Sequence, residues 1–318
     1  QRARKSLHGG VPMLWMIRWA GSFPIFAREA KGAHFTDVDG NSYIDFCLGD
    51  TGAMTGHAPD ATVKAITEQI QKGITLMLPF EDVIWVGEEL QRRFKLPYWQ
   101  FALTATDANR FVLRMARLIT GRPKILVFNY CYHGSVDETF ITMDEEGTPM
   151  SRPNNMGPQI DPRETSKVIE FNDIAALETA LSARDVAAVL AEPVMTNIGI
   201  IHPNPGYHDA LRELTRKYGT YLIIDETHTI CTGPGGYTAS HGLRPDFLTL
   251  GKPLAGGVPA AIYGFTEEVS KAFADKLAVD DADVGGIGGT LAGNALSIAA
   301  MKATLQNVLT DEFYSKAI

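Results

Sequence analysis

The sequence predicts an α/β fold built on a mostly parallel sheet with helices packed on its faces. Apolar runs of strand length alternate with stretches of helical period along most of the chain. The predicted strands are also almost wholly apolar, which is typical of strands buried on both faces. With 318 residues, the chain is long enough for about two domains at roughly 150 residues each.

The beginning of the chain predicts a small N-terminal lobe. The segment 32–46 carries Asp-Val-Asp-Gly at 37–40 between apolar and aromatic residues, a pattern typical of a hairpin with a Gly-containing turn. We therefore predict an N-terminal lobe over 1–55 and a large domain over 56–318. The chain starts at Gln1 without an apolar leader and stops at Ile318 directly after a helical pattern, so we expect both ends to be incomplete.

The large domain is predicted element by element from its hydrophobic pattern. Helical periodicity predicts helices over 61–72, 81–94, 107–120, 174–182, 207–218, 267–274 and 292–309. Short runs rich in Val, Ile, Leu and aromatic residues predict strands over 124–128, 186–190, 221–225, 247–250 and 260–265. The stretch 142–165 has many Pro and Gly residues and no clear period, so we expect either an active-site flap or a disordered surface insertion.

Composition excludes several function classes. The 29 Lys and Arg against 37 Asp and Glu leave a net charge of −8, whereas binding to nucleic-acid phosphates needs a basic surplus. No apolar run approaches the ~20 residues that cross a bilayer, so we expect a soluble protein without a membrane partner. Cys47, Cys131 and Cys231 form no C-x-x-C pattern, so we predict no disulfide framework, no metal site and a reducing, cytoplasmic setting.

Ligands of an open parallel sheet bind beyond the carboxyl ends of its strands, and polar segments there are candidate sites. The segment 103–109 leads small and hydroxyl-bearing residues into a helix expected to begin near Asp107. Free N–H groups and the helix dipole favour an anion at such a point, although Thr106 could instead be only an N-cap. Tyr132, after the strand 124–128, could stack on a flat ligand ring or simply pack.

Two further segments complete the candidate site. Asp225 and Glu226 end an apolar strand, and because side chains alternate along a strand, they must face opposite ways and cannot both serve one site. Lys252 follows another apolar strand between glycines, which makes it a candidate for Schiff-base chemistry unless it is a solvated loop lysine. Anion cradle, aromatic face, carboxylate and amine are, in this order, the parts that pyridoxal phosphate requires.

These segments resemble the class III aminotransferases, which are fold-type I pyridoxal-phosphate enzymes, and among them the glutamate-1-semialdehyde aminomutase branch. Thr-Ala-Thr-Asp-Ala-Asn at 104–109 stands where the family has Ser-Gly-Thr-Glu-Ala-Asn, and Tyr-His-Gly at 132–134 matches the family. Thr-Leu-Gly-Lys at 249–252 matches its Schiff-base segment, and Gly-Thr-x-x-Gly-Asn at 289–294 is similar to a further family run. The resemblance extends over nearly the whole chain.

The resemblance implies pyridoxal 5′-phosphate as cofactor and a role for each matching residue. Lys252 would hold the cofactor and move protons, and Asp225 would contact the pyridinium nitrogen and keep it protonated. The other implied cofactor contacts are Ala105 and Thr106 at the phosphate, Tyr132 and Thr227 on the two sides of the ring, and Asn197 near the ring. Thr290 would reach the phosphate of a partner subunit, which implies a homodimer with shared active sites.

The chain also departs from the family. Ala105 replaces a glycine and Asp107 a glutamate, so the phosphate turn is expected to be bulkier. Thr-His-Thr-Ile-Cys-Thr at 227–232 differs from the family's Val-x-Thr-Gly-Phe-Arg and changes the floor of the pocket. The C-terminal lobe that completes the family's substrate pocket is absent from this chain. Arg18 aligns with an arginine that binds a substrate carboxylate, or it is an exposed surface residue.

The hypothesis from sequence is amino-group transfer between an amino acid or amine and a keto acid, ketone or aldehyde. One alternative is an aminomutase, in which the amino group returns to the same molecule. Others are an amino-acid racemase on the same scaffold and a non-catalytic relative that only binds the cofactor. A dinucleotide binder is suggested only by the Gly-rich string 285–289, which lacks the strand-turn-helix context of such sites.

Overall fold

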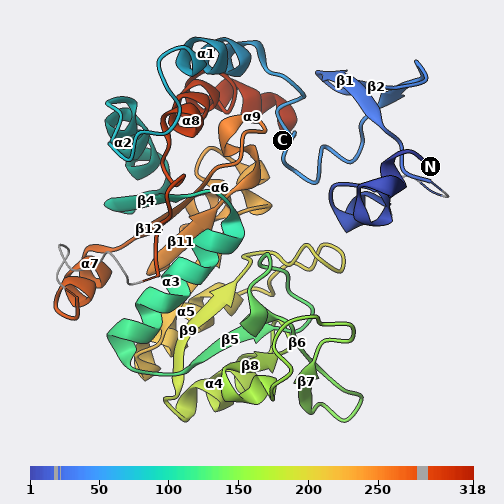
Figure 1. The fold of residues 1–318 in the computed structure, drawn as a ribbon. Helices are drawn as coiled ribbons and strands as arrows, with labels where there is room; N and C mark the ends of the chain where they lie inside the picture. The colour runs from blue at the N-terminus through green and yellow to red at the C-terminus, as the bar shows by residue number, and fades with distance from the viewer. Residues whose placement is uncertain (18–20, 22, 278–285) are drawn as a thin grey trace.

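The computed structural model describes residues 1–17, 21, 23–277 and 286–318. At the centre of these residues is a seven-stranded sheet (Figure 1). Its strands are β4 (Tyr98–Ala102), β5 (Lys124–Phe128), β8 (Ser166–Ile169), β9 (Val186–Ala191), β10 (Tyr221–Asp225), β11 (Phe247–Leu250) and β12 (Ala261–Phe265). Their order is β4-β12-β11-β10-β9-β5-β8, and among these described strands β12 alone runs opposite to the other six. The predicted α/β fold class is confirmed.

The predicted strands are the central ones, and the missed strands are at the edges. β5, β10 and β11 have the predicted bounds, and β9 and β12 differ by one residue. β4 and β8 were not predicted because each lies at one end of the sheet. An edge strand is partly exposed, so β4 carries Gln100 among apolar residues, and β8 carries Ser166 and Lys167 before two apolar residues. These polar residues interrupt the continuous apolar run by which the central strands are recognised.

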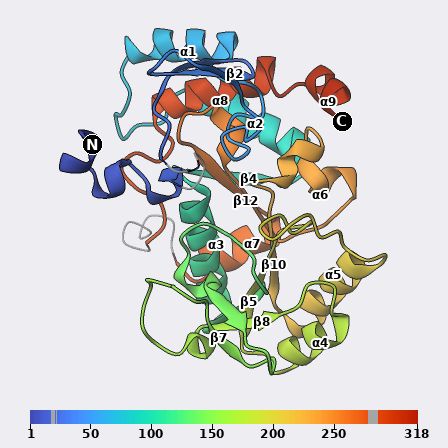
Figure 2. The same cartoon turned by 90° about the vertical axis from the view of Figure 1, so that its right-hand side faces the viewer.

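Helices cover both faces of the sheet. The helices are α1 (Asp60–Ile70), α2 (Asp82–Phe94), α3 (Ala105–Thr120), α4 (Ile174–Ser182), α5 (Tyr207–Tyr218), α6 (Gly236–Ser240), α7 (Glu267–Ala274), α8 (Ala295–Asn307) and α9 (Asp311–Ala317). Figure 2 shows α3 on one side of the sheet and α4 and α5 on the other. The apolar core lies between these layers, around β5, β9 and β10, and continues under α2 and α8 beside β11 and β12.

Some helix bounds differ from the prediction for local reasons. α8 begins three residues later than expected because the Asn294 side chain accepts a hydrogen bond from the Ser297 N–H and caps the helix there. α6 and α9 were not predicted. Both are short, so neither contains enough turns to show a helical period in the sequence.

The predicted N-terminal hairpin is confirmed and belongs to a separate three-stranded antiparallel sheet. Its strands are β1 (Ala27–Lys31), which was not predicted, β2 (His34–Asp37) and β3 (Ser42–Ile44). The Asp37 carboxylate accepts hydrogen bonds from the Asn41 backbone and the Tyr43 hydroxyl, which stabilises the turn between β2 and β3. Gly32 pairs with His57 across the proposed lobe boundary, and that boundary at residue 55 stays a prediction.

The stretch 142–165 is not the featureless loop expected. It contains most of a hairpin of β6 (Ile141–Met143) and β7 (Pro149–Ser151), followed by a 3₁₀ turn at Pro162–Glu164. β6 packs beside β8, and the described residues of this stretch do not line the main cavity. The alternative of a disordered insertion is therefore wrong, and the active-site flap stays a prediction. No helix in the described part of the chain is both long and apolar enough to span a membrane.

Candidate active site

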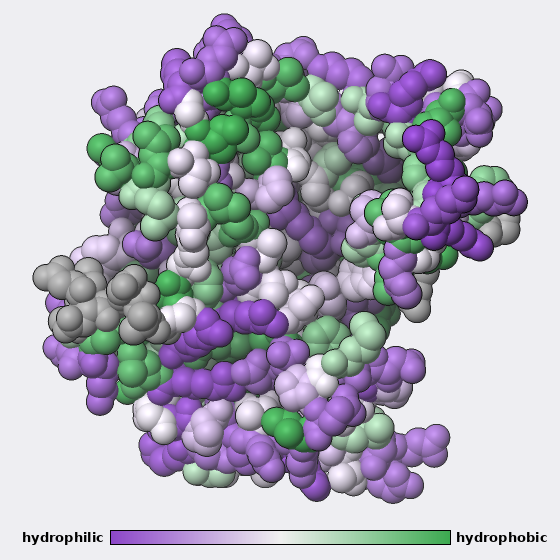
Figure 3. Space-filling model, viewed as in Figure 1, coloured by the Kyte–Doolittle hydropathy of each residue, from purple (hydrophilic) through white to green (hydrophobic). Residues whose placement is uncertain are grey.

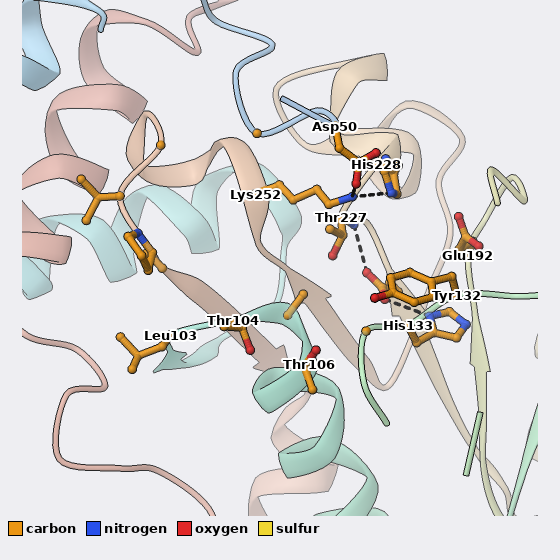
Figure 4. Close-up of a pocket in the computed structure, with 18 of the residues that line it drawn as sticks. Asp50, Leu103, Thr104, Thr106, Tyr132, His133, Glu192, Thr227, His228 and Lys252 are labelled. Atoms are coloured by element: carbon orange, nitrogen blue, oxygen red, sulfur yellow. Dashed lines mark hydrogen bonds and ion pairs between the residues drawn. The ribbon is translucent and has the colours of Figure 1, made fainter. Parts of the chain in front are cut away.

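A cavity of about 400 Å³ opens where the carboxyl ends of the parallel strands meet (Figure 4). This volume lies within the usual range of small-molecule sites, roughly 300–1,000 Å³. Residues of the segments that follow β4, β5, β9, β10 and β11 line it, together with Trp15 and Asp50 of the N-terminal segment. Segments far apart in the sequence therefore build one site at the sheet edge where ligands are expected.

The first turn of α3 forms one end of the cavity. Thr104, Ala105 and Thr106 line it, and the Thr104 Oγ1 caps the helix by accepting from the Asp107 N–H at 3.2 Å. The helix thus begins at Ala105 rather than near Asp107, and the N-cap alternative for Thr106 is wrong. Thr106 instead accepts from the Ser135 N–H at 3.0 Å. Unpaired N–H groups and the helix dipole at this end favour a phosphate.

The bulk of Ala105 is accommodated by a neighbouring glycine. A Cβ atom added to Gly251 would lie 3.1 Å from the Ala105 Cβ. Because Gly251 has no side chain, the Ala105 methyl group fits beside the segment that carries Lys252. The expected bulkier turn is present, and the opposing backbone leaves space for it.

Gly134 holds the loop after β5 against the same turn. Its φ is +77°, and a Cβ atom there would lie 2.0 Å from the Thr106 Oγ1. Gly147, in the β6–β7 turn, has a φ of +79° but nothing within 4 Å of an added Cβ. The two glycines therefore share a backbone conformation and differ in the space around them.

We expect Gly134→Ala to lower the free energy of unfolding by about 3 kcal/mol, from left-handed strain plus overpacking. Gly147→Ala, which adds only the strain, should cost about 1 kcal/mol. Denaturant unfolding of both variants measures the difference, and pyridoxal-phosphate binding should weaken only in Gly134→Ala. Equal losses of stability in the two variants would contradict a close packing of Gly134 on Thr106.

A buried carboxylate lies at the floor of the cavity. Asp225 accepts hydrogen bonds from the His133 Nδ1 at 2.9 Å, the Asn109 Nδ2 at 2.9 Å and the Thr227 N–H at 3.0 Å. Burial alone would raise its pKa, but the His133 hydrogen bond and charge and the other donors hold the pKa of Asp225 at about 2. Thr249 donates to the Asn109 Oδ1 at 2.7 Å, which fixes the amide orientation. Asp225 is therefore an ionised, oriented partner for a cationic ring nitrogen.

His133 and Asn109 were present in the predicted motifs but had been given no role. Burial disfavours a charged His133, but Cys131 and Asp225 raise the pKa of His133 to about 10. His133 follows Tyr132 in sequence, and Asn109 lies one turn into α3. Both residues lie in motifs that the sequence had already singled out, and this position was the one signal for a role in the site. Their contact with Asp225, however, depends on packing between three elements.

Glu226 faces away from the site, as predicted from strand alternation. It accepts hydrogen bonds from the Thr229 hydroxyl at 2.6 Å and from the Tyr237 N–H at 3.1 Å. The Thr238 N–H is a further donor to the same carboxylate, and burial raises the pKa of Glu226. Asp225 and Glu226 therefore have separate partners, and Glu226 connects β10 to α6.

Lys252 projects into the cavity from the turn after β11. Its backbone φ is +50°, an uncommon left-handed conformation for a residue with a side chain, and such strain often marks functional sites. The amine Nζ lies 2.6 Å from the His228 Nε2 and 3.0 Å from the Asp50 Oδ2 (Figure 4). Its side chain is 23% exposed, so Lys252 is not the solvated loop lysine of the alternative interpretation. His228 and Asp50 are site residues that the sequence did not reveal.

Tyr132, Thr227 and Glu192 complete the walls. Tyr132 is half-buried in the cavity, with its ring centroid 5.4 Å from that of Trp15. The Thr227 Oγ1 and the Glu192 Oε1 are buried and have no hydrogen-bond partner among the described residues. Leaving such atoms unpaired costs about 1–3 kcal/mol each. A flat ligand with polar ring substituents fits these groups, and pyridoxal phosphate is such a ligand.

Three predicted site residues lie outside the cavity lining or outside the described residues. Asn197 is exposed, and its Nδ2 donates to the Tyr130 carbonyl at 2.8 Å, which supports the loop before Tyr132. Thr290 lines a separate hollow on the other side of the first turn of α3, beside Asp107. Arg18 lies outside the described residues. The roles proposed for these three residues stay predictions.

The fold and the site together define a pyridoxal-phosphate-dependent enzyme of fold type I. An amine, an ionised carboxylate, an aromatic ring and a helix N-terminus surround one cavity at the carboxyl edge of a mostly parallel sheet. The chain belongs to the class III aminotransferase family, because the family model "Aminotransferase class-III" matches residues 15–318. Pyridoxal phosphate is the cofactor of this family.

Known proteins are similar to this chain over most of its length. It is 36% identical over 323 residues to the glutamate-1-semialdehyde 2,1-aminomutase of Methanocaldococcus jannaschii, covering 99% of this chain and 73% of the relative. A solved glutamate-1-semialdehyde aminomutase from Pseudomonas aeruginosa PAO1 is 50% identical, with a TM-score of 0.95 over 98% of this chain and 70% of that chain. An omega-transaminase from Sphaerobacter thermophilus is 31% identical, with a TM-score of 0.87 over 98% of this chain and 72% of that chain.

Proposed function

We propose that the protein catalyses an intramolecular amino-group shift of the glutamate-1-semialdehyde type. The observation that supports this most is the 50% identity to the Pseudomonas aeruginosa aminomutase across 98% of the chain. A variant of that enzyme has been solved in complex with pyridoxamine phosphate, the amino form of the cofactor. The relatives thus favour the aminomutase alternative over the transfer between two molecules that the sequence hypothesis put first.

The residues around the cavity can carry out the chemistry that such a shift requires. When bound, pyridoxal phosphate accepts an amino group and stabilises negative charge on the adjacent substrate carbon. The Lys252 amine can bind the cofactor and then move a proton at the substrate carbon. The ionised Asp225 can keep a ring nitrogen protonated, and the first turn of α3 can hold the phosphate.

Amino transfer between two molecules remains the second candidate. It is supported by the likeness to the omega-transaminase and by the segment 227–232, which departs from the family pattern and includes the cavity residues Thr227 and His228. A changed floor alters which substrates fit, because contacts there decide between competing ligands. A racemase would use the same lysine but leave the amino group in place and change only the stereochemistry at its carbon.

An apolar surface supports the homodimer implied by the resemblance. Ile74, Leu76, Met77 and Leu78 are exposed between α1 and α2, and Figure 3 shows hydrophobic side chains gathered over this part of the molecule. The Ala295 N–H donates to the Ile74 carbonyl, which places this segment beside the start of α8. Exposed apolar patches of this kind commonly mark protein interfaces.

We expect the holoenzyme to convert glutamate 1-semialdehyde to the isomer with its amino group on carbon 1, without any added acceptor. Mass spectrometry of the reaction mixture measures whether the product forms mole for mole from the substrate when no keto acid is present. Stoichiometric conversion supports the aminomutase. Dependence on an added keto acid would support the transaminase, and inversion at carbon 2 with no shift would support the racemase.

A further inference from the structure

His228 connects the cofactor lysine to the N-terminal segment. Its Nε2 lies 2.6 Å from the Lys252 Nζ, and its Nδ1 lies 2.9 Å from the Thr51 Oγ1. An ammonium group has only donors, so the His228 Nε2 must accept from Lys252 and the ring proton must be on Nδ1. Nδ1 then donates to Thr51, which selects the tautomer that presents a lone pair to the lysine.

The charges around His228 favour a neutral ring while Lys252 is protonated. Burial and the Lys252 charge lower the pKa of His228, whereas the carboxylates of Asp50 and Asp225 act in the opposite direction. Lys252 lies in the turn after β11, Asp50 in the N-terminal segment and Asp225 at the end of β10. A second positive charge 2.6 Å from the ammonium would be strongly repelled. Transfer of a proton from the ammonium to the imidazole leaves only one of the two groups charged.

We propose that His228 is a positioning residue for Lys252, which holds the amine in the cavity and accepts its proton when the amine reacts. In this step the Nζ–H bond breaks and an Nε2–H bond forms. The electron pair stays on Nζ, and the positive charge moves to the imidazole ring, where the negative charges of Asp50 and Asp225 favour it. The proposal rests on Lys252 as the residue that binds the cofactor.

The segment 227–232, which departs from the family pattern, supplies the residue that positions Lys252. His228 belongs to the segment that differs from the family pattern, and Thr51 belongs to the N-terminal wall of the cavity. Thr51 has a φ of +72°, and Asp50 has a φ of +55°. Two successive residues in this uncommon conformation direct their side chains toward His228 and Lys252, as the two hydrogen bonds show.

The test is the rate at which apoprotein captures pyridoxal phosphate between pH 6 and pH 10, followed by the visible absorbance of the bound cofactor. We expect His228→Gln to lower the rate about tenfold or more at pH 6.5 relative to the unmodified protein. The ratio of rates should rise toward one at the alkaline end of this range, because hydroxide in the solvent then competes with the imidazole as the proton acceptor. The cofactor's own titration cancels in this ratio.

The pH dependence of the ratio separates a proton-accepting role from a structural one. Loss of packing would lower the rate by the same factor at every pH, and a flat ratio would overturn the proposal. Thr51→Val should show a smaller loss in the same direction, because it removes only the group that selects the tautomer. If His228→Gln fails to fold, Thr51→Val decides, and a flat ratio for it overturns the proposal as well.

Two further variants complete the experiment. His208 is half-buried but outside the cavity, with its Nε2 facing the Pro193 carbonyl at 2.9 Å, so His208→Gln should leave the ratio at one throughout. Lys252→Ala should capture no cofactor by this route. If it captured cofactor normally, the assignment of Lys252 would fail, whereas a flat ratio for His228→Gln would overturn only the role of His228.

Discussion

Lys252→Ala is expected to lower turnover by at least about a thousandfold, because one side chain supplies both the nucleophile and the group that moves protons. The amine lies in the cavity and is held by Asp50 and His228. Steady-state kinetics of the holoenzyme measure the loss. The visible absorbance of the bound cofactor, and its removal by borohydride, should disappear with the amine.

Lys252→Arg is the matched control for this prediction. Arginine keeps the positive charge beside Asp50 but offers no primary amine. It should therefore fold at least as well as Lys252→Ala and be equally inactive. Near-normal turnover in either variant would show that another group carries the chemistry.

Asp225→Asn is expected to lower kcat about a hundredfold, the usual scale for removing one preorganised electrostatic partner. The pKa of Asp225 is about 2, below the ordinary value of 3.8, so its stabilising contribution is complete above pH 4 and is lost as the pH falls through 2. The carboxylate is therefore charged across the pH range of any ordinary assay. Its loss should also cost about 3 kcal/mol, because His133 loses its buried partner.

Glu226→Gln separates the two effects of Asp225→Asn. Glu226 is the next residue along the chain, is equally buried and, among the described residues, accepts from Thr229, Tyr237 and Thr238, which do not line the cavity. Its replacement should lower the melting temperature, since an amide N–H would then face N–H donors, but leave kcat of the folded enzyme unchanged. Comparable losses of kcat in both variants would contradict a special role for Asp225. Kinetics and thermal unfolding of the two proteins make the comparison.

The central strands and most helices could be predicted because the signal for each is local. β10 is a continuous apolar run that ends in Asp225, and α3 carries an amphipathic period that ends at Gly121. Edge strands such as β4 and β8 could not be predicted, because an edge position follows from strand order and leaves a mixed pattern. The start of α3 depended on which of two threonines is the N-cap. Thr104 accepts from the Asp107 N–H, three residues on, whereas Thr106 would have accepted from the N–H of residue 108 or 109, and local spacing allows both.

The sequence by itself determined the fold class, the cofactor and the lysine and carboxylate proposed to act on it, because each lies in a local motif at the end of a buried strand. Only the tertiary structure decided what surrounds them. Asp50 is 202 residues from Lys252 in sequence, and the His228 contact depends on the turns after two neighbouring strands. Such contacts form when packing brings distant segments within about 3 Å, and no periodicity or spacing encodes that distance.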